Sequence, residues 1–439
     1  MTRSKHGSSS TKARKPRFTS IEICAGAGGQ AVGLHQAGFG HLALVEIDQH
    51  AVETLELNIK GDEADPAWAW ESNNCKILSK DVKAFDPLTE VTNDGRWITQ
   101  GELDLLAGGV PCPPFSHAGK QLGKNDERDL FPRMLELVGI LRPRAVMIEN
   151  VRGIMDPKFA SYRAWIATML EGGEYADDDG HTATEPGLGY KISKWDVLEA
   201  SDFGVPQLRP RAILVAFRAD VIGDLDYKWP EATHNAPMSV AKSLEPTMRE
   251  RYGHYDKLTG STEGMAAFER WKKIASERQK ELEGKGGGVG PTLVGGSKKH
   301  GGADLGPSRA KAAWRQLGIS GMGVANDIDT CTEKQTHERD LFGTDGPMLT
   351  VQQAAIIQGF PLNWRFSGGK TAQYRQVGNA FPPPVAHAVG KSIAKVLEEA
   401  DKRKKKSVRN KPVKAAQKRK QDGSSEQYGL LDEAELRAS

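Results

Sequence analysis

The chain has 439 residues, of which 38% are hydrophobic, so it is long enough for two folded domains with a substantial core. Its formal net charge is +3. It contains no apolar run of membrane-spanning length, and its N-terminus lacks the apolar segment of a secretory signal, so we expect a cytoplasmic protein without a membrane partner. Its four cysteines are far apart and form no Cys-x-x-Cys pair, which argues against a disulfide framework and predicts no metal site.

An excess of basic over acidic residues is found near the two ends of the chain. Residues 1–17 carry six Lys or Arg and no acid, and residues 401–420 carry eleven Lys or Arg against Asp401 alone. Both the N-terminal tail and the charged C-terminal tail, residues 401–439, are poor in apolar residues and are predicted to be disordered. Composition is equally consistent with tails that only maintain solubility and with tails that bind phosphate groups.

Alternating strands and helices occupy the first half of the chain. A strand beginning at residue 18 runs into a glycine turn, followed by a helix over 30–38 and a strand over 41–48. The pattern returns with a strand at 103–109, a helix at 129–141 and a strand at 144–150, and further strands are expected at 190–200 and 211–218. This order predicts an α/β fold with a parallel, doubly wound sheet.

The regular alternation of strand and helix patterns ends after residue 218. Residues 219–346 include a long glycine-rich stretch of mixed charge, which predicts a separate, smaller and irregular domain rather than more sheet. Regular patterns resume near residue 347 and end with a helix over 384–400.

A glycine turn follows the first predicted strand. Gly26, Gly28 and Gly29 would let a ligand approach the backbone at a helix N-terminus, and Glu46, at the end of the second strand, stands where a ribose diol is bound. The same spacing satisfies a nicotinamide-dinucleotide fingerprint, and a purely structural turn is a third reading. Asp81 follows a third candidate strand and could bind an adenine amine, although a capping aspartate is the commoner meaning.

The stretch PCPP places Cys112 between prolines. Proline fixes its own φ and disfavours helix in the residue before it, so the thiol is held in a stiff, extended loop. A small buried apolar residue is the usual role of a free cysteine, and a nucleophilic thiol is the alternative.

Two further polar groups stand at predicted strand ends. Glu149 ends an apolar strand at the edge where open α/β sheets bind ligands, and it could donate a proton to a ring nitrogen or serve as a cap or ion-pair partner. Gln207, Arg209 and Arg211 alternate along an extended segment, so their side chains are expected to point the same way. They would form either a clamp for an anion or base edge or a solvated strand face.

The ordered set of these motifs, with the late stretch QVGNAFPPPVAHAVG, resembles the cytosine-C5 DNA methyltransferases. The resemblance covers residues 18–218 and 347–400. It implies a Rossmann-like S-adenosylmethionine-dependent methyltransferase sheet and assigns residues 219–346 to a target-recognition domain. In this family a cysteine adds to C6 of a cytosine flipped out of double-stranded DNA, and the methyl group of S-adenosylmethionine moves to C5.

The family's functional residues carry over to matching positions. The resemblance implies that the catalytic residues are Cys112, Glu149, Arg209 and Arg211. It implies a cofactor site made of Gly26, Ala27, Gly28, Gly29, Glu46, Ile47, Asp81, Val82 and Asn379. Three positions depart from the family pattern: Cys24 replaces a usual Phe, VPCPP replaces Pro-Pro-Cys-Gln-Pro, and Gln353 replaces a usual Glu.

The remaining expectations concern partners. Basic residues of the glycine-rich stretch are candidates for DNA contacts, namely Lys298, Lys299, Arg309, Lys311 and Arg315. The resemblance suggests a monomer from a bacterium or a phage, with a restriction endonuclease as a candidate partner. Alternatives are a transfer-RNA cytosine methyltransferase, disfavoured because no Cys-Phe-Thr tripeptide is present, a nicotinamide-dependent oxidoreductase, and a catalytically inactive DNA-binding module.

Overall fold

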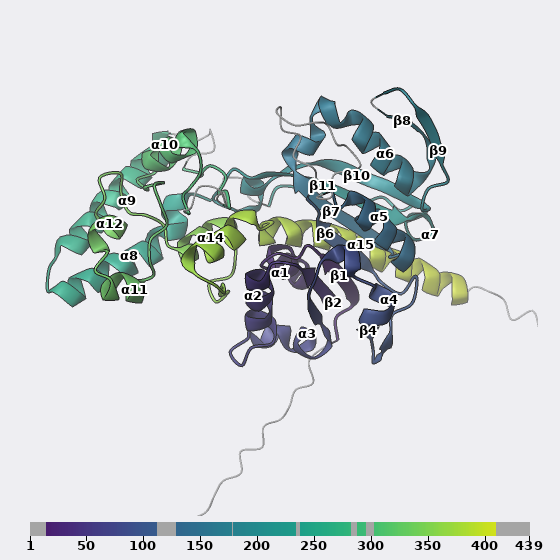
Figure 1. Ribbon diagram of the computed structural model, residues 1–439, viewed down its shortest axis with the longest axis horizontal. Coiled ribbons are helices and arrows are strands. Elements are labelled where there is room, and N and C mark those ends of the chain that lie inside the picture. The colour runs from purple at the N-terminus through teal and green to yellow at the C-terminus, as the bar shows by residue number, and fades with distance from the viewer. Residues whose placement is uncertain are drawn as a thin grey trace, which may run out of the picture.

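A computed structural model describes residues 15–111, 129–177, 179–233, 238–281, 288–295 and 303–409. Figure 1 shows a sheet flanked by helices and a second, mainly helical body, with α14 between the two. None of the helices in these ranges is both long and apolar enough to span a membrane.

Seven strands form the main sheet, in the order β10-β11-β7-β6-β1-β2-β3. Their bounds are β1 Phe18–Ile23, β2 Phe39–Glu46, β3 Lys76–Ser79, β6 Leu105–Gly109, β7 Ala145–Val151, β10 Tyr190–Glu199 and β11 Pro210–Arg218. Strands β3, β2, β1, β6 and β7 pair in parallel, as expected for a Rossmann-like methyltransferase sheet. Strand β11 departs from the parallel expectation, since it is antiparallel to both of its neighbours. The connection from β10 to β11 contains only a short 3-10 turn, too little for a parallel crossover.

Helices cover both faces of this sheet (Figure 1). Alternate strand residues belong to different cores: Leu106 and Ile148 pack with α5 and α6, whereas Leu105 and Met147 pack with α1 and α15. The helices of this part are α1 Gly29–Gln36, α2 Gln49–Ile59, α3 Ala69–Asn74, α4 Pro87–Glu90, α5 Phe131–Leu141, α6 Ala160–Glu171, α7 Ala219–Ile222 and α15 Pro383–Arg409. Two small hairpins, β4 Thr92–Asn93 with β5 Arg96–Trp97 and β8 Gly173–Ala176 with β9 Thr182–Glu185, lie outside the main sheet.

The second body is more regular than its glycine-rich sequence suggested. Helices α8 and α9 pack against each other, and Val240, Leu244, Met248 and Tyr252 of α8 are buried at helical spacing. The helices of this part are α8 Val240–Thr259, α9 Glu263–Glu281, α10 Ser308–Gln316, α11 Ile328–Glu333, α12 His337–Leu341 and α13 Val351–Gln358. Helix α14, Lys370–Asn379, lies between this body and the sheet domain (Figure 1).

The expected segment boundaries shift in two places. Tyr227 and Trp229 still pack against the core of the sheet domain, so the chain leaves that core later than residue 218. Helix α15 continues beyond residue 400 to Arg409, where disorder was expected. The extension is tied to the sheet domain by ion pairs from Asp401 to Arg144, at 2.6 Å, and from Arg403 to Asp224.

Candidate active site

The glycine turn between β1 and α1 forms the floor of the site. Gly26 and Gly28 have φ of 53° and 87°, in the left-handed region that side chains rarely adopt. A Cβ on Gly26 would meet nothing within 4 Å, whereas one on Gly28 would lie 2.8 Å from Cζ2 of Trp364. The indole Nε1–H of Trp364 donates to the Ala27 carbonyl at 3.0 Å, so the C-terminal segment holds the turn in place.

Glu46, the last residue of β2, turns its carboxylate toward the same turn. Its Oε2 accepts from the Gly26 N–H at 2.7 Å, and its Oε1 accepts from the N–H groups of Ile47 and Asp48, both at 2.8 Å. These bonds fix the carboxylate at the carboxyl edge of the sheet, and Oε2, which accepts only one of them, keeps lone-pair capacity for a ligand hydroxyl. The position therefore fits the predicted binding of a ribose.

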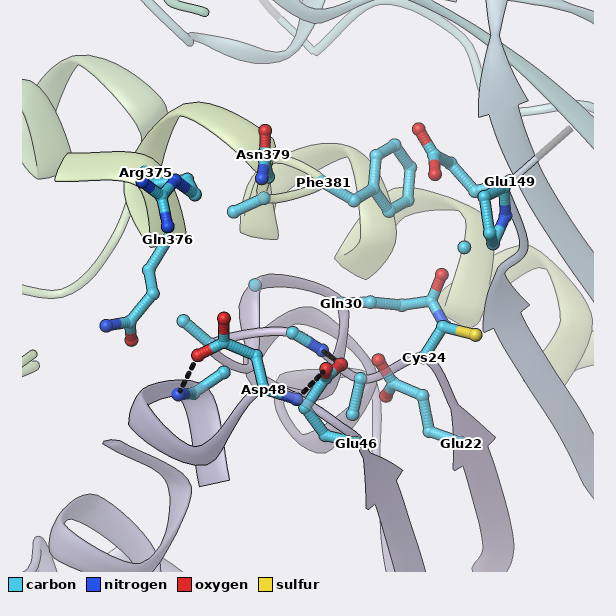
Figure 2. A pocket seen from close by; sticks show the side chains of 18 of the residues that line it. Glu22, Cys24, Gln30, Glu46, Asp48, Glu149, Arg375, Gln376, Asn379 and Phe381 are labelled. Carbon is cyan, nitrogen blue, oxygen red and sulfur yellow. Dashed lines mark hydrogen bonds between the residues drawn. The ribbon is translucent and has the colours of Figure 1, made fainter. Parts of the chain in front are cut away.

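A cavity of about 330 Å³ opens above the turn, a size typical of small-ligand sites (Figure 2). It brings together six predicted residues from distant parts of the chain: Gly26, Ala27, Gly29, Glu46, Glu149 and Asn379. Four carboxyl-bearing residues line it, against the single arginine Arg375: Glu22, Glu46, Asp48 and Glu149. This charge balance suits a positively charged ligand, and S-adenosylmethionine carries a sulfonium and an ammonium group.

Four predicted cofactor residues do not line this cavity. Gly28 lies behind the turn, and Val82 is buried in the sheet-domain core. Asp81 caps the 3-10 turn Val82–Ala84, and its Oδ1 accepts from the Lys83 N–H at 2.9 Å. Ile47 follows Glu46 and is 67% exposed, which leaves it available to contact a ligand from solvent. The roles of Asp81 and Ile47 stay predictions.

Glu149 and Arg211 form a half-buried ion pair at the edge of the cavity. Strand β7 carries Glu149 and strand β11 carries Arg211, and the Arg211 Nε–H lies 2.8 Å from Glu149 Oε1. Burial raises the pKa of Glu149, while the positive charges of Arg211 and Arg209 act in the opposite direction. A carboxyl group with a raised pKa can hold a proton and donate it to a ring nitrogen.

The side chains of Gln207 and Arg209 contact other residues than the side chain of Arg211 does. Arg209 is 1% exposed, and its guanidinium donates to the carbonyls of Leu293 at 2.7 Å, Gly378 at 2.6 Å and Ala380 at 2.9 Å. Gln207 accepts from the Leu293 N–H at 2.7 Å. The alternation of Gln207, Arg209 and Arg211 predicted that all three side chains point the same way. This prediction holds for Gln207 and Arg209, which both contact Leu293, and it is wrong for Arg211, which pairs with Glu149. Arg209 connects the second body to the end of α14, beside Asn379, and is placed for positioning rather than for touching a substrate.

Cys112 lies outside the described residues, as do Lys298 and Lys299. The preceding residue, Pro111, lines the cavity, and its carbonyl accepts from the Leu130 N–H at 3.4 Å. Pro111, the residue before Cys112 in the sequence, therefore lies at the cavity wall with Gly109 and Glu149. The nucleophilic role of Cys112 stays a prediction.

Cys24 lines the cavity where the family pattern has an aromatic residue. Burial, the nearby Glu46 and the nearby Asp81 raise the pKa of its thiol to about 12. Phe381, from the segment between α14 and α15, contributes the only aromatic ring to the described cavity wall. Burial also raises the thiol pKa of the other two described cysteines, Cys75 and Cys331.

The candidate DNA-contacting residues that are described lie on or beside α10. Lys311 forms an ion pair with Asp304 at 2.8 Å, and Arg315 forms one with Asp345 at 2.9 Å. Arg309 is exposed, and no ion pair or hydrogen bond engages its side chain within the described ranges. Arg309 is therefore the best placed of the three to meet a phosphate group.

Sequence reasoning missed several cavity residues, and those with the most distinctive side chains include Glu22, Gln30, Arg375 and Phe381. Glu22 carried a usable signal, because a carboxylate within FTSIEI, a strand buried on both faces, is costly unless it serves a site. Gln30 opens a helix, and Arg375 lies on α14 far along the chain. Only the fold shows that these two meet.

Comparisons with known proteins agree with this geometry. Residues 18–395 match the C-5 cytosine-specific DNA methylase family. The chain is 42% identical over 378 residues to the Type II methyltransferase M.NaeI of Lentzea aerocolonigenes, covering 86% of this chain and 75% of the relative. It is 39% identical over 390 residues to the Type II methyltransferase M.NgoMIV of Neisseria gonorrhoeae, covering 87% of this chain and 99% of the relative.

A solved structure of the Entamoeba histolytica methyltransferase EhMeth shares the fold, with a TM-score of 0.50 and 14% identity over 88% of this chain and 99% of that one. The family as a whole uses S-adenosylmethionine. The chain has a mostly parallel sheet of the kind expected for such an enzyme, and a cavity lined by acidic residues lies at its carboxyl edge. The chain therefore belongs to the C-5 cytosine-specific DNA methylases, and it is a sequence-specific DNA (cytosine-5) methyltransferase.

Proposed function

We propose that the enzyme methylates C5 of a cytosine flipped out of double-stranded DNA, through a covalent bond between Cys112 and C6. The observation that carries the proposal is the position of the Glu149–Arg211 pair. Glu149 lies at the carboxyl edge of the sheet, on the wall of the same cavity as Glu46, Asn379 and Pro111, and Arg211 is paired with it. A candidate proton donor, a cavity of suitable size for the cofactor and Pro111, the residue before Cys112 in the sequence, thus meet at one place.

The cofactor that suits this cavity is S-adenosylmethionine. Glu46 would hold the ribose hydroxyls, the turn at Gly26 would lie along the methionine part, and Asn379 would support the site from α14. When bound, S-adenosylmethionine supplies an electrophilic methyl group on a sulfonium sulfur. The acidic cavity wall favours this charged form over its neutral thioether product.

The chemistry explains why a cysteine is needed. C5 of cytosine is a poor nucleophile, and addition of the Cys112 thiolate to C6 converts C5 into an enamine carbon. Glu149 donates a proton to N3, which offsets the charge that develops on the ring, and Arg211 approaches O2. After the methyl group has been transferred, loss of the C5 proton to a base restores the double bond and expels Cys112.

In this proposal, the mainly helical second body binds the DNA. A cytosine inside a duplex hides C5 and C6, so it must rotate out of the stack at a cost of a few kcal/mol. We assign sequence reading to residues 219–346, with Arg309 as a phosphate contact. Because the relatives above are Type II methyltransferases, we also propose a companion restriction endonuclease that cuts the same site. A monomer acting on DNA is the expected form.

Release of tritium from duplex DNA containing [5-³H]cytosine tests this route, because C5 loses its hydrogen only if the ring is activated and substituted there. We expect release to equal methyl transfer for the wild-type enzyme. Glu149→Gln should slow release by about 10²–10⁴-fold while cofactor binding persists, since it removes only the proton donor. Methyl transfer without tritium release would overturn the proposal, as would full activity of Glu149→Gln.

A further inference from the structure

Helix α15 has one buried apolar face and an opposite face that is rich in lysine. Val389, Ile393 and Leu397 on the apolar face belong to the core of the sheet domain. Their spacing from the lysines matters because an α-helix turns by about 100° per residue. Four exposed lysines lie within about 60° of one another around the helix axis, on the side opposite the apolar residues. These four side chains form what we call the lysine stripe: Lys391, Lys395, Lys402 and Lys406.

The charges around the stripe leave it strongly positive. None of its four lysines forms an ion pair or a side-chain hydrogen bond within the described ranges. Three acidic residues occur among the lysines. Glu398 pairs with Arg17 at 2.5 Å, and Asp401 pairs with Arg144 at 2.6 Å. In the described part of the chain, Glu399 alone among these three acids keeps an unpaired negative charge.

Two ordinary explanations cover part of this pattern. Exposed charges on a helix often serve solubility alone, and cations near a helix C-terminus complement the helix dipole. The dipole acts only on the last turn or two, whereas Lys391 and Lys395 lie near the middle of the 27-residue helix. Solubility requires charge, but it does not require charges of one sign along one line.

The stripe has the length of a contact with a nucleic-acid backbone. Fifteen residues separate Lys391 from Lys406, which corresponds to about 22 Å along the helix. Duplex DNA presents a phosphate about every 3.4 Å along each strand, so about six phosphates of one strand span this length. A row of lysines of this extent can therefore follow a phosphate backbone without reading its sequence.

The stripe extends away from the catalytic cavity. Helix α15 begins two residues after Phe381, which lines the cavity, and near its other end Asp401 pairs with Arg144, the residue before β7. The helix therefore runs from the carboxyl edge of the sheet to its amino edge. Figure 1 shows that it ends beyond the sheet domain, on the side away from the second body. DNA bound at the cavity would meet the distal lysines only with a segment outside the target site.

We propose that the lysine stripe of α15 binds the phosphate backbone of DNA outside the recognition site, as a second contact that is independent of sequence. Each lysine that neutralises a phosphate releases counterions, so the contact favours long DNA over a duplex that covers only the site. Both basic terminal segments of the chain begin at this surface, because Arg17 contacts α15 and α15 itself carries residues 401–409. The stripe keeps the enzyme on DNA between target sites.

Fluorescence anisotropy with three labelled duplexes tests the proposal. The duplexes are about 12 base pairs around the mapped recognition site, about 60 base pairs that contain the site, and about 60 base pairs that lack it. The stripe variant replaces the three lysines farthest from the cavity with glutamine, which removes charge and favours helix equally well. The control variant removes the same charge from exposed lysines on other elements of the sheet domain. The stripe variant is Lys395→Gln, Lys402→Gln and Lys406→Gln, and the control is Lys60→Gln, Lys191→Gln and Lys228→Gln.

The stripe variant should bind long DNA about 10-fold more weakly, with a slope of log K against log salt that is smaller by about two to three. Its affinity for the short duplex and its rate of methyl transfer to that duplex should stay within about twofold of wild type, which shows that the variant is folded. Weakening on both long duplexes would identify any DNA segment as the ligand, and weakening only on the one with the site would identify the flank of the target duplex. The control variant should bind all three duplexes as wild type does.

Three results would overturn the inference: equal weakening on short and long duplexes, unchanged binding to all of them, or the same loss in the control variant. An effect confined to duplex RNA of the same length would also overturn it, because the proposed ligand is DNA. Methyl transfer by the wild-type enzyme is a separate readout. Its absence from the short duplex would refute the proposed function and would not bear on the stripe.

Discussion

Replacing Arg209 with methionine should lower the free energy of unfolding, and it should not remove a contact with the substrate. The variant removes three hydrogen bonds, to the carbonyls of Leu293, Gly378 and Ala380, from a side chain that is 1% exposed. The Ala380 carbonyl still accepts from the Gln358 side chain, so the variant leaves the carbonyls of Leu293 and Gly378 without a donor, at about 1–3 kcal/mol each. Removal of a buried charge that has no ion-pair partner offsets part of this loss, so we expect a net decrease in the free energy of unfolding of about 2–4 kcal/mol.

Urea denaturation and thermal melting measure this loss, which for a chain of 439 residues corresponds to a fall in Tm of about 2–5 °C. Arg211→Met is the matched control: it lies two residues along and pairs with Glu149 rather than with the second body. Arg211→Met should lose activity with little loss of stability, and Arg209→Lys should fall between Arg209→Met and wild type. If Arg209→Met were as stable as wild type yet inactive, Arg209 would be a substrate contact and the positioning role would be wrong.

Three further predictions follow from buried or exposed side chains. Burial lowers the pKa of His41 to about 4, so below pH 6.5 the imidazole is protonated in the unfolded chain but stays neutral in the folded protein. As the pH falls from 6.5 to 5, the free energy of unfolding should therefore decrease by about 2 kcal/mol more for the wild type than for His41→Gln, as measured by urea titration. Arg309→Ala should weaken DNA binding equally for all sequences and reduce the slope of log K against log salt by about one, and an unchanged slope would exclude a phosphate contact. Iodoacetamide at pH 8 should alkylate Cys112 and spare the three described cysteines, whose thiol pKa values are raised by burial, as peptide mass spectrometry would show. Labelling of Cys24 before Cys112 would contradict the last prediction.

The sequence predicted the carboxyl edge of the sheet well, because short-range signals define it. A strand that runs into a glycine turn places Gly26, and Glu46 follows from its spacing along the βαβ unit. Glu149 was placed correctly because it ends an apolar run that forms β7. Each of these positions depends on residues within the same strand–turn–helix unit.

Long-range contacts account for what the sequence did not reveal. Arg209 meets carbonyls from Leu293 and from residues 378–380, so no local pattern distinguishes it from Arg211 two positions away. Gln30 lines the cavity only because α14 and α15 return beside the glycine turn. The residues that are buried in α8 and α9 have helical spacing in the sequence. The glycine-rich stretch that follows these helices nevertheless led to the prediction of an irregular domain over residues 219–346.

Trapping of the covalent intermediate tests the central claim most directly. The purified enzyme, S-adenosylmethionine and duplex DNA containing 5-fluorocytosine would be resolved on a denaturing gel, because fluorine at C5 blocks the final elimination. Wild type and Cys24→Ser should both give a protein–DNA band of reduced mobility, and Cys112→Ser should give none. A band that persists in Cys112→Ser and disappears in Cys24→Ser would contradict the assignment of the nucleophile, and the absence of any adduct from an enzyme that forms 5-methylcytosine would contradict the covalent route.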